Sequence, residues 1–174
     1  MRTWLQRIRK LRERRLVRWT LDALLVLAVL FAVTAWQTRH HARGDAPDFA
    51  LPTLEGGVVT KRDLAGKPTL LVFWAPWCTV CRLESANISR VRDLVGERAN
   101  VVSIASSYED VAAVRRYVEE RAVDYPVLLG GAEVARDYRV SVFPTVYFLD
   151  DEGRISGSVV GYTTTAGLLW RLWF

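Results

Sequence analysis

Two cysteines, the only ones in the chain, follow an apolar run, and this arrangement restricts the fold more than any other feature. The run from Thr69 to Trp74 is apolar after its first residue and predicts a central strand that is buried on both faces. Cys78 and Cys81 come next, where the sequence predicts a helix over residues 78–95 with Leu83, Ile88, Val91 and Val95 facing inward. We therefore expect a strand, a short loop and a helix whose first turn holds both sulfur atoms.

The position of the cysteines predicts redox chemistry. A cysteine in the first turn of a helix meets free backbone N–H groups and the positive end of the helix dipole. Both favour the thiolate, which is the form that attacks disulfides. Cys78 is therefore predicted to be the exposed nucleophile, and Cys81, one turn further on the same face, the more buried resolving cysteine. A purely structural disulfide is disfavoured, because so short a loop stabilises little.

The rest of the chain alternates short strands with helices, which indicates an α/β domain. Residues 48–51 and 58–60 predict a hairpin around a turn at 55–57, and residues 63–66 predict a connecting turn. The other predicted elements are strands at 100–105, 125–129, 145–150 and 155–161, and helices at 109–122, 132–138 and 164–173. In the helix at 109–122, Val111, Val114 and Val118 are expected to share one apolar side.

The positive charge is confined to one end of the chain. The formal net charge is +5, but the first 19 residues hold eight basic residues and one acidic residue, a net of +7. The remaining residues hold 16 basic and 18 acidic residues, a net of −2. Nucleic-acid binding needs a basic face on the folded domain. We therefore expect no nucleic-acid partner.

An apolar segment follows the basic arm. Every residue from Ala23 to Val33 is apolar, and Trp19 and Trp36 bound a stretch about 27 Å long as a helix, close to the ~30 Å hydrocarbon core of a bilayer. Indoles favour the two interfaces, and basic residues before a span remain in the cytoplasm. The sequence thus predicts a single-pass inner-membrane protein with its C-terminal domain in the periplasm, a compartment that permits disulfides.

The predicted organisation has four parts: a cytoplasmic basic arm at 1–19, a transmembrane anchor at 20–36, a linker at 37–45 and a folded domain at 46–174. A signal peptide cleaved near residues 33–35 and a twin-arginine signal at Arg14-Arg15 are alternatives, and both would also export the domain. His40 and His41 lie in the linker, and adjacent side chains converge poorly on one ion. No metal and no cofactor is expected.

Two segments resemble the signatures of the thioredoxin family. The run from Trp74 to Arg82 resembles the family's active-site run, and the run from Val142 to Thr145 resembles its cis-proline loop. The resemblance implies a thioredoxin-like fold, with a central mixed sheet flanked by helices and an extra N-terminal hairpin, and a thiol-disulfide oxidoreductase that acts on proteins. It also implies a cis bond before Pro144 and a loop that offers its backbone, with Phe143 and Thr145, to an extended client. Trp77 is expected as a surface lid beside the site.

Other segments resemble particular branches of that family. Residues 46–49 and 63–68 resemble the membrane-anchored branch whose members reduce thiols in cytochrome c maturation, and residues 161–173 are similar to the thioredoxin-like protein grouped with bacterial suppressors of copper sensitivity. Glu84 matches a glutamate of the first branch, which implies a proton acceptor for Cys81; the alternative is a solvated helix carboxylate. Val80 stands where a proline usually precedes the second cysteine, so the redox potential stays open.

The predicted function is that of a reductase of protein disulfides, kept reduced by a membrane electron-donor protein. The alternatives are a periplasmic thiol oxidant, a copper- or client-binding module without turnover, and a peroxidase. The absence of any histidine after His41 counts against copper. Trp170, Trp173 and Phe174 are expected to form the apolar face of the last helix, with contact to a membrane surface or a partner as the alternative.

Overall fold

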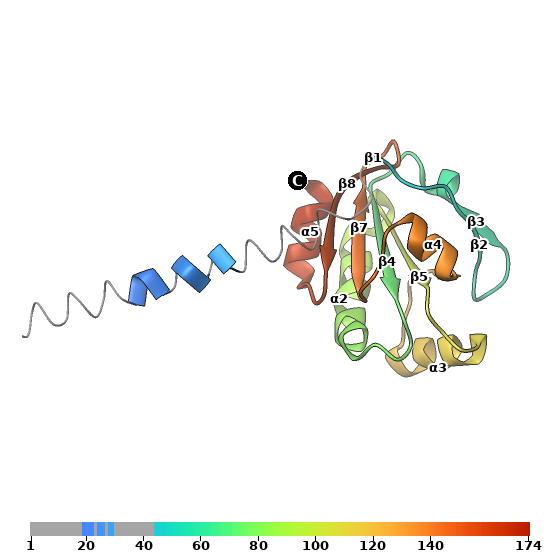
Figure 1. Ribbon diagram of the computed structural model, residues 1–174. Coiled ribbons are helices and arrows are strands. Elements are labelled where there is room, and N and C mark those ends of the chain that lie inside the picture. Colours follow the sequence, from blue (N-terminus) through green and yellow to red (C-terminus); the bar gives the residue numbers. More distant parts are fainter. Residues whose placement is uncertain (1–18, 23, 27, 30–43) are drawn as a thin grey trace, which may run out of the picture. The chain divides into compact units, whose positions relative to one another are not determined.

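The computed structural model describes residues 19–22, 24–26, 28–29 and 44–174 (Figure 1). The chain divides into two units, residues 1–39 and 40–174. In the first unit, the described residues are helical. None of the helices in the described part of the chain has the length and apolar character needed to cross a bilayer. The basic arm up to residue 18, most of the anchor predicted at 20–36 and the linker up to residue 43 lie outside the described residues.

A six-stranded mixed sheet forms the centre of the second unit, as in the predicted thioredoxin-like fold. Its strand order is β1-β8-β7-β4-β5-β6. Strands β4, β5 and β6 are parallel, whereas β7 is antiparallel to β4, β8 to β7 and β1 to β8. The strands are β1 (Gly44–Asp45), β4 (Thr69–Trp74), β5 (Asn100–Ala105), β6 (Val127–Leu129), β7 (Thr145–Leu149) and β8 (Arg154–Val160).

The N-terminal hairpin is present beside this sheet. It consists of β2 (Ala50–Pro52) and β3 (Val58–Thr60), so its first strand begins two residues later than predicted. A 3₁₀ helix, η1 (Lys61–Leu64), covers the first half of the segment 63–66, where a turn was predicted. Strand β1 was not predicted, because two residues are too few to show a pattern. The sheet therefore includes two residues that the sequence analysis assigned to the linker.

Helices cover both faces of the sheet, and β4 shows why. Leu70 and Val72 point to the face covered by α2 (Thr79–Val95) and α5 (Thr165–Trp173). Leu71 and Phe73 point to the opposite face, which is covered by α4 (Ala132–Asp137) and the N-terminal segment. All four side chains are buried. Each buried side chain of this size stabilises the fold by roughly 1.5–3 kcal/mol, which explains why a continuous apolar run becomes the central strand.

Helix α3 (Val111–Arg121) packs beside α2 at one end of the sheet. The Asp110 side chain caps it by accepting a hydrogen bond from the backbone N–H of Ala113 at 2.7 Å. Val114 faces the core, but Val111 is exposed, contrary to the prediction. The buried face of α3 holds Val114 and Tyr117, and Val111 lies about 120° from Tyr117 around the helix.

Helix α2 differs from the prediction in which side chains it buries. Leu83, expected to point inward, is 63% exposed, whereas the neighbouring Glu84 is fully buried. Ile88, Val91 and Val95 are buried as predicted. Successive helical residues are about 100° apart, so a face that holds residues 84, 88, 91 and 95 cannot also hold residue 83. A short 3₁₀ helix, η2 (Gly96–Arg98), follows α2.

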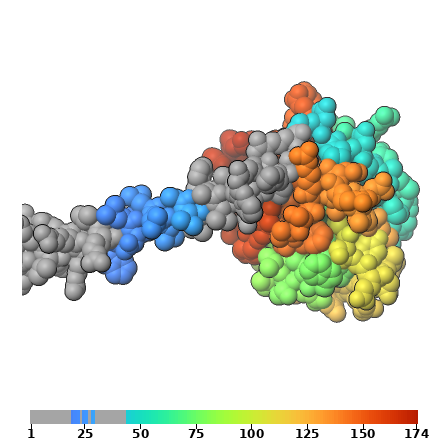
Figure 2. All heavy atoms as spheres, in the orientation of Figure 1, coloured from blue at the N-terminus to red at the C-terminus, as the bar shows by residue number. Residues whose placement is uncertain are grey.

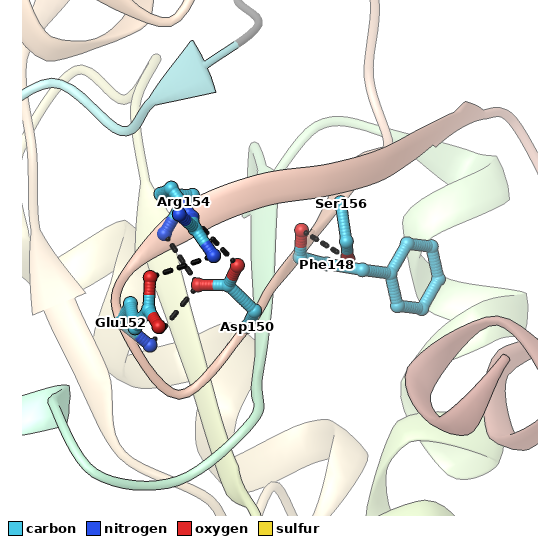
Figure 3. Close-up of polar contacts among 5 residues, drawn as sticks. All are labelled: Phe148, Asp150, Glu152, Arg154 and Ser156. Atoms are coloured by element: carbon cyan, nitrogen blue, oxygen red, sulfur yellow. Dashed lines mark hydrogen bonds and ion pairs between the residues drawn. The ribbon is translucent and has the colours of Figure 1, made fainter.

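The turn between β7 and β8 is held by charged groups (Figure 3). The Asp150 carboxylate accepts hydrogen bonds from the backbone N–H groups of Glu152 and Arg154 and from Nε of Arg154, at 2.8–3.0 Å. These donors lower the pKa of Asp150 below its ordinary value. The Gly153 carbonyl in the same turn accepts from the N–H of Ala46 at 3.2 Å. This bond holds the start of the domain against the β7–β8 turn. The turn and strand β1 lie at the same end of the domain (Figures 1 and 2).

Candidate active site

The two cysteines meet at the start of α2. The helix was predicted to begin at Cys78, but it begins at Thr79, and Cys78 is its N-cap. The Cys78 Sγ accepts a hydrogen bond from the backbone N–H of Cys81 at 3.1 Å. The two residues form a disulfide with 5.3 Å between their Cα atoms. A donated N–H at a helix N-terminus stabilises negative charge on the sulfur. This placement suits Cys78 to be the attacking thiolate once the disulfide is reduced.

The two cysteines differ little in exposure, although Cys78 was predicted to be the more exposed. Cys78 is 5% exposed and Cys81 is 3% exposed, so Cys78 is not the exposed residue that the sequence analysis expected. Both pack in a cluster that includes Trp74 and Tyr117. Cys78 was predicted to be exposed because it lies at the start of a helix, but the side chains of this cluster cover it.

Exposed apolar side chains surround the disulfide. Trp77 is 66% exposed, and its ring meets the edge of the Phe143 ring with 5.9 Å between centroids. The bond between Phe143 and Pro144 is cis, as predicted. Val80 and Val142 are also exposed. The redox pair and the cis-proline loop, more than 60 residues apart in the sequence, therefore share one apolar rim.

Thr145 has a different surrounding from the one expected for a client-binding residue. Its side chain is buried, and its hydroxyl donates a hydrogen bond to the carbonyl of Val142 at 2.7 Å. This bond closes the loop on itself across Pro144. Thr145 thus holds the loop in shape instead of presenting its hydroxyl to the surface.

Glu84 lies deep beside this region and is not the solvated carboxylate that the sequence left open. Burial raises its pKa to about 7, and a hydrogen bond from the backbone N–H of Thr163 opposes that rise. The Thr163 N–H lies 2.9 Å from Oε1, while Oε2 is buried with no hydrogen-bond partner among the described residues. Glu84 is one turn beyond Cys81 on α2. A buried carboxyl with one vacant oxygen is suited to take up a proton near neutral pH.

Arg82 has partners of its own. It forms an ion pair with Glu120 at 2.8 Å and lies over the ring of Tyr117, with 5.6 Å to the centroid. Burial raises the pKa of Tyr117 to about 12, so the phenol stays protonated near neutral pH. Tyr117 in turn packs against Trp74, with 4.1 Å between ring centroids. Arg82 therefore fastens α2 to α3 beside the disulfide.

Comparison with known proteins agrees with this geometry. Residues 42–158 match the AhpC/TSA family. The chain belongs to the AhpC/TSA family. Among its relatives is the thioredoxin-like protein YneN of Bacillus subtilis, 34% identical over 121 residues, which are 68% of this chain and 71% of the relative. The thiol-disulfide oxidoreductase ResA of Oceanobacillus iheyensis is 32% identical over 168 residues, 90% of this chain and 86% of the relative.

This AhpC/TSA protein also resembles solved structures of thiol:disulfide interchange proteins. The crystal structure of a putative thiol:disulfide interchange protein DsbE from Chlorobium tepidum superposes with a TM-score of 0.68 at 26% identity, covering 76% of this chain and 99% of that one. Because the relatives are thiol-disulfide oxidoreductases and this chain has the cysteine pair, it is a thioredoxin-like thiol-disulfide oxidoreductase of the ResA/DsbE type.

Metal ligands do not gather in the described part of this family member. No group of three or more histidine, cysteine, aspartate or glutamate side chains that would hold an ion occurs among the described residues. His40 and His41 lie outside those residues.

One residue that holds the loop beside Glu84 was not predicted. Asn87 donates from Nδ2 to the Thr163 carbonyl at 3.0 Å and accepts from the Thr165 hydroxyl at 3.3 Å. These contacts join α2 to the loop before α5, across more than 75 positions of sequence. The single available signal was the spacing of Asn87, which shares a helix face with Glu84.

Proposed function

We propose that this protein reduces disulfides of exported client proteins from a membrane-anchored position. The observation that carries the proposal is the placement of the Cys78 sulfur at the N-terminus of α2, where it accepts the backbone N–H of Cys81. The buried Glu84 lies one helical turn after Cys81.

The reaction has two steps. The Cys78 thiolate attacks one sulfur of a client disulfide, so that the client S–S bond breaks and its other sulfur leaves as a thiolate. The Cys81 sulfur then attacks Cys78 in the mixed disulfide and releases the second client sulfur as a thiolate. Two electrons pass to the client, and the Cys78–Cys81 disulfide remains. A membrane electron-donor protein restores the two thiols.

Glu84 serves the second step. The Cys81 thiol must lose its proton before it attacks, and the Glu84 carboxylate accepts that proton in this proposal. A pKa of about 7 supports the role, because a base works best when its pKa is near the operating pH. The hydrogen bond from Thr163 keeps one oxygen fixed and leaves the other for the proton.

The apolar rim binds the client in this proposal. Trp77 and Phe143 offer aromatic surface on the two sides of the rim, and the loop at Pro144 offers backbone to an extended segment of the client. Proline has no N–H, so Pro144 itself donates no backbone hydrogen bond within the loop. Thr145 supports the loop through its bond to Val142.

The location rests on the N-terminal sequence. The proposed parts are a cytoplasmic arm at 1–19, an anchor at 20–36, a linker at 37–45 and a periplasmic domain at 46–174, with β1 joining the sheet from the end of the linker. The +7 charge of the arm supports this orientation in the inner membrane.

Substrate trapping tests the proposal. In Cys81→Ala the second step is blocked, so Cys78 should accumulate mixed disulfides that reducing agent releases and that mass spectrometry identifies. Cys78→Ala/Cys81→Ala is the matched control and should capture nothing. A trap that stays empty in Cys81→Ala when cells are grown under several conditions would contradict the function.

The redox potential tests the direction. Thioredoxin-like pairs range from about −270 mV for reductants to about −120 mV for oxidants. We expect equilibration with glutathione or dithiothreitol to place this pair nearer the first value. A potential above about −180 mV would instead support the periplasmic oxidant.

A further inference from the structure

Helix α5 carries a second apolar face that the domain does not bury. Leu168 and Leu172 pack in the core, whereas Trp170, Trp173 and Phe174 are 66%, 42% and 88% exposed. We call these three residues the α5 aromatic face. The Trp170 and Phe174 rings stack at 4.6 Å between centroids. Large aromatic side chains gathered on a surface indicate an interaction site.

Cations and a hollow accompany these rings. The Arg98 guanidinium lies over the Trp173 ring, 5.9 Å from its centroid. Arg171 lines an open hollow of about 400 Å³ together with Trp170 and Phe174. Its floor includes Phe148 and Ser156 of β7 and β8, which are joined by a hydrogen bond of 3.1 Å (Figure 3). Aromatic rings with arginines beside them suit a surface that is apolar below and anionic above.

The α5 aromatic face lies at the end of the domain opposite the redox site. Helix α2 begins directly after Cys78, and its 17 residues run about 25 Å before η2, where Arg98 contacts the Trp173 ring. Helix α5 runs the same way, because its start is bound to Asn87 and its last turn reaches Arg98.

The chain also enters the domain at that end. Strand β1 pairs with Arg154 and Ile155, at the start of β8, while the end of β8 pairs with Thr145 beside the cis-proline loop. β1 and the C-terminal end of α5 therefore lie away from the redox site (Figure 1). A chain that leaves a membrane after residue 36 has seven residues before β1, a reach of at most about 25 Å.

We propose that the α5 aromatic face rests in the headgroup region of the bilayer that holds the anchor. The inference rests on the anchor proposed above. A tether that short keeps the face at high effective concentration near the lipid. Indoles prefer the interface between water and hydrocarbon, and Arg171 can reach lipid phosphates. The Arg98 guanidinium donates to the carbonyls of Leu94 and Val95, so it serves to hold the Trp173 ring at this surface. Docked in this way, the domain holds Cys78 about 25 Å above the surface, the length of α2, and turns it toward soluble clients.

Quenching by brominated lipid tests the contact. The full chain is placed in vesicles of phosphatidylethanolamine and phosphatidylglycerol, with or without bromine near the top of the acyl chains. The emission of Trp170 and Trp173 is the difference between the wild-type protein and Trp170→Phe/Trp173→Phe. We expect bromine to lower this difference at least about twofold, because indoles in the interface would lie close to the top of the acyl chains. The emission of Trp77, obtained in the same way from Trp77→Phe, should not change.

Three results would overturn the inference. In the first, bromine leaves the emission of Trp170 and Trp173 unchanged and aqueous acrylamide quenches it, which shows a free surface. In the second, neither reagent quenches, which shows that protein covers the face, either a second copy or a partner. In the third, the chain does not float with the vesicles, so the anchor itself fails.

Disulfide exchange with a soluble client peptide, measured in the same vesicles, separates this inference from the proposed reaction. Trp170→Phe/Trp173→Phe should exchange at the wild-type rate. Lipid quenching without any exchange in the wild-type protein would leave the contact in place and contradict the reductase.

Discussion

The backbone N–H of Thr163 donates a hydrogen bond to Oε1 of Glu84 across 2.9 Å, and this bond joins the loop before α5 to the helix that carries the redox pair. The other carboxyl oxygen has no partner among the described residues. Burial without full hydrogen bonding makes the charged form of Glu84 costly, which is why its pKa rises. The acid-base behaviour of the site therefore depends on how this loop is held.

Glu84→Gln should remove a pH dependence of stability. The folded protein holds the Glu84 proton up to about pH 7, whereas the unfolded chain releases it near 4.5. The free energy of unfolding contributed by Glu84 should thus fall as pH rises between these values, by about 3 kcal/mol at most. Urea denaturation of the oxidised protein from pH 4 to 8 measures this slope. Glu120→Gln, at an exposed carboxylate, should keep it, and equal slopes in the wild type and Glu84→Gln would contradict the burial of Glu84.

Asn87→Ala should loosen the loop that holds Glu84. The substitution removes the hydrogen bond to the Thr163 carbonyl and should lower the free energy of unfolding by about 1–3 kcal/mol. A less fixed Thr163 N–H also supports the carboxylate less, so the pH range over which Glu84 titrates should move upward. Arg90→Ala, at an exposed position of the same helix, should change stability by less than about 0.5 kcal/mol. An unchanged titration of Glu84 in Asn87→Ala would show that the loop does not need this amide.

Gly130→Ala should destabilise the domain, because the new methyl group meets packed side chains. A Cβ at Gly130 would lie 2.4 Å from Cγ2 of Ile104 and 2.9 Å from Cγ1 of Val134. Overpacking of this kind costs about 1–3 kcal/mol. The adjacent Gly131→Ala is the matched control, since its Cβ has no neighbour within 4 Å. Gly131 is the N-cap of α4, so this variant should lose only the preference of an N-cap for glycine over alanine, and its melting temperature should fall less than that of Gly130→Ala. Equal melting temperatures for the two variants would contradict the close packing of α4 against β5.

Trp77→Ala should weaken the reaction with protein clients but not the fold. Its ring is mostly exposed and contacts Phe143, so its loss removes client-binding surface with less than about 1 kcal/mol of stability. The KM for a disulfide-bonded protein should rise several-fold, while the rate with a small disulfide such as oxidised glutathione should change little. Leu94→Ala, an exposed apolar residue at the far end of α2, is the control. A parallel loss with both substrates would assign Trp77 to the chemistry instead of to client binding.

Local sequence predicted the elements that carry the cysteines. Strand β4 spans the six residues predicted, because an apolar run has one stable environment, the centre of a covered sheet. The N-cap position of Cys78 also follows from its neighbours, although the helix begins one residue later than expected. The pairing of β1 with β8 was not predictable, since two residues carry no period and their partners lie more than 100 positions away.

Strand β4, the two cysteines at the start of a helix and the proline before Thr145 could be predicted without a structure, because each depends on a few consecutive residues. The burial of Glu84, the exposure of Leu83 and the contact of Thr163 with the Glu84 carboxyl depend on how the folded chain packs. The physical reason is that burial depends on which distant segment covers a helix face. The approach of α5 to α2 sets the surroundings of Glu84, and no local pattern reports it.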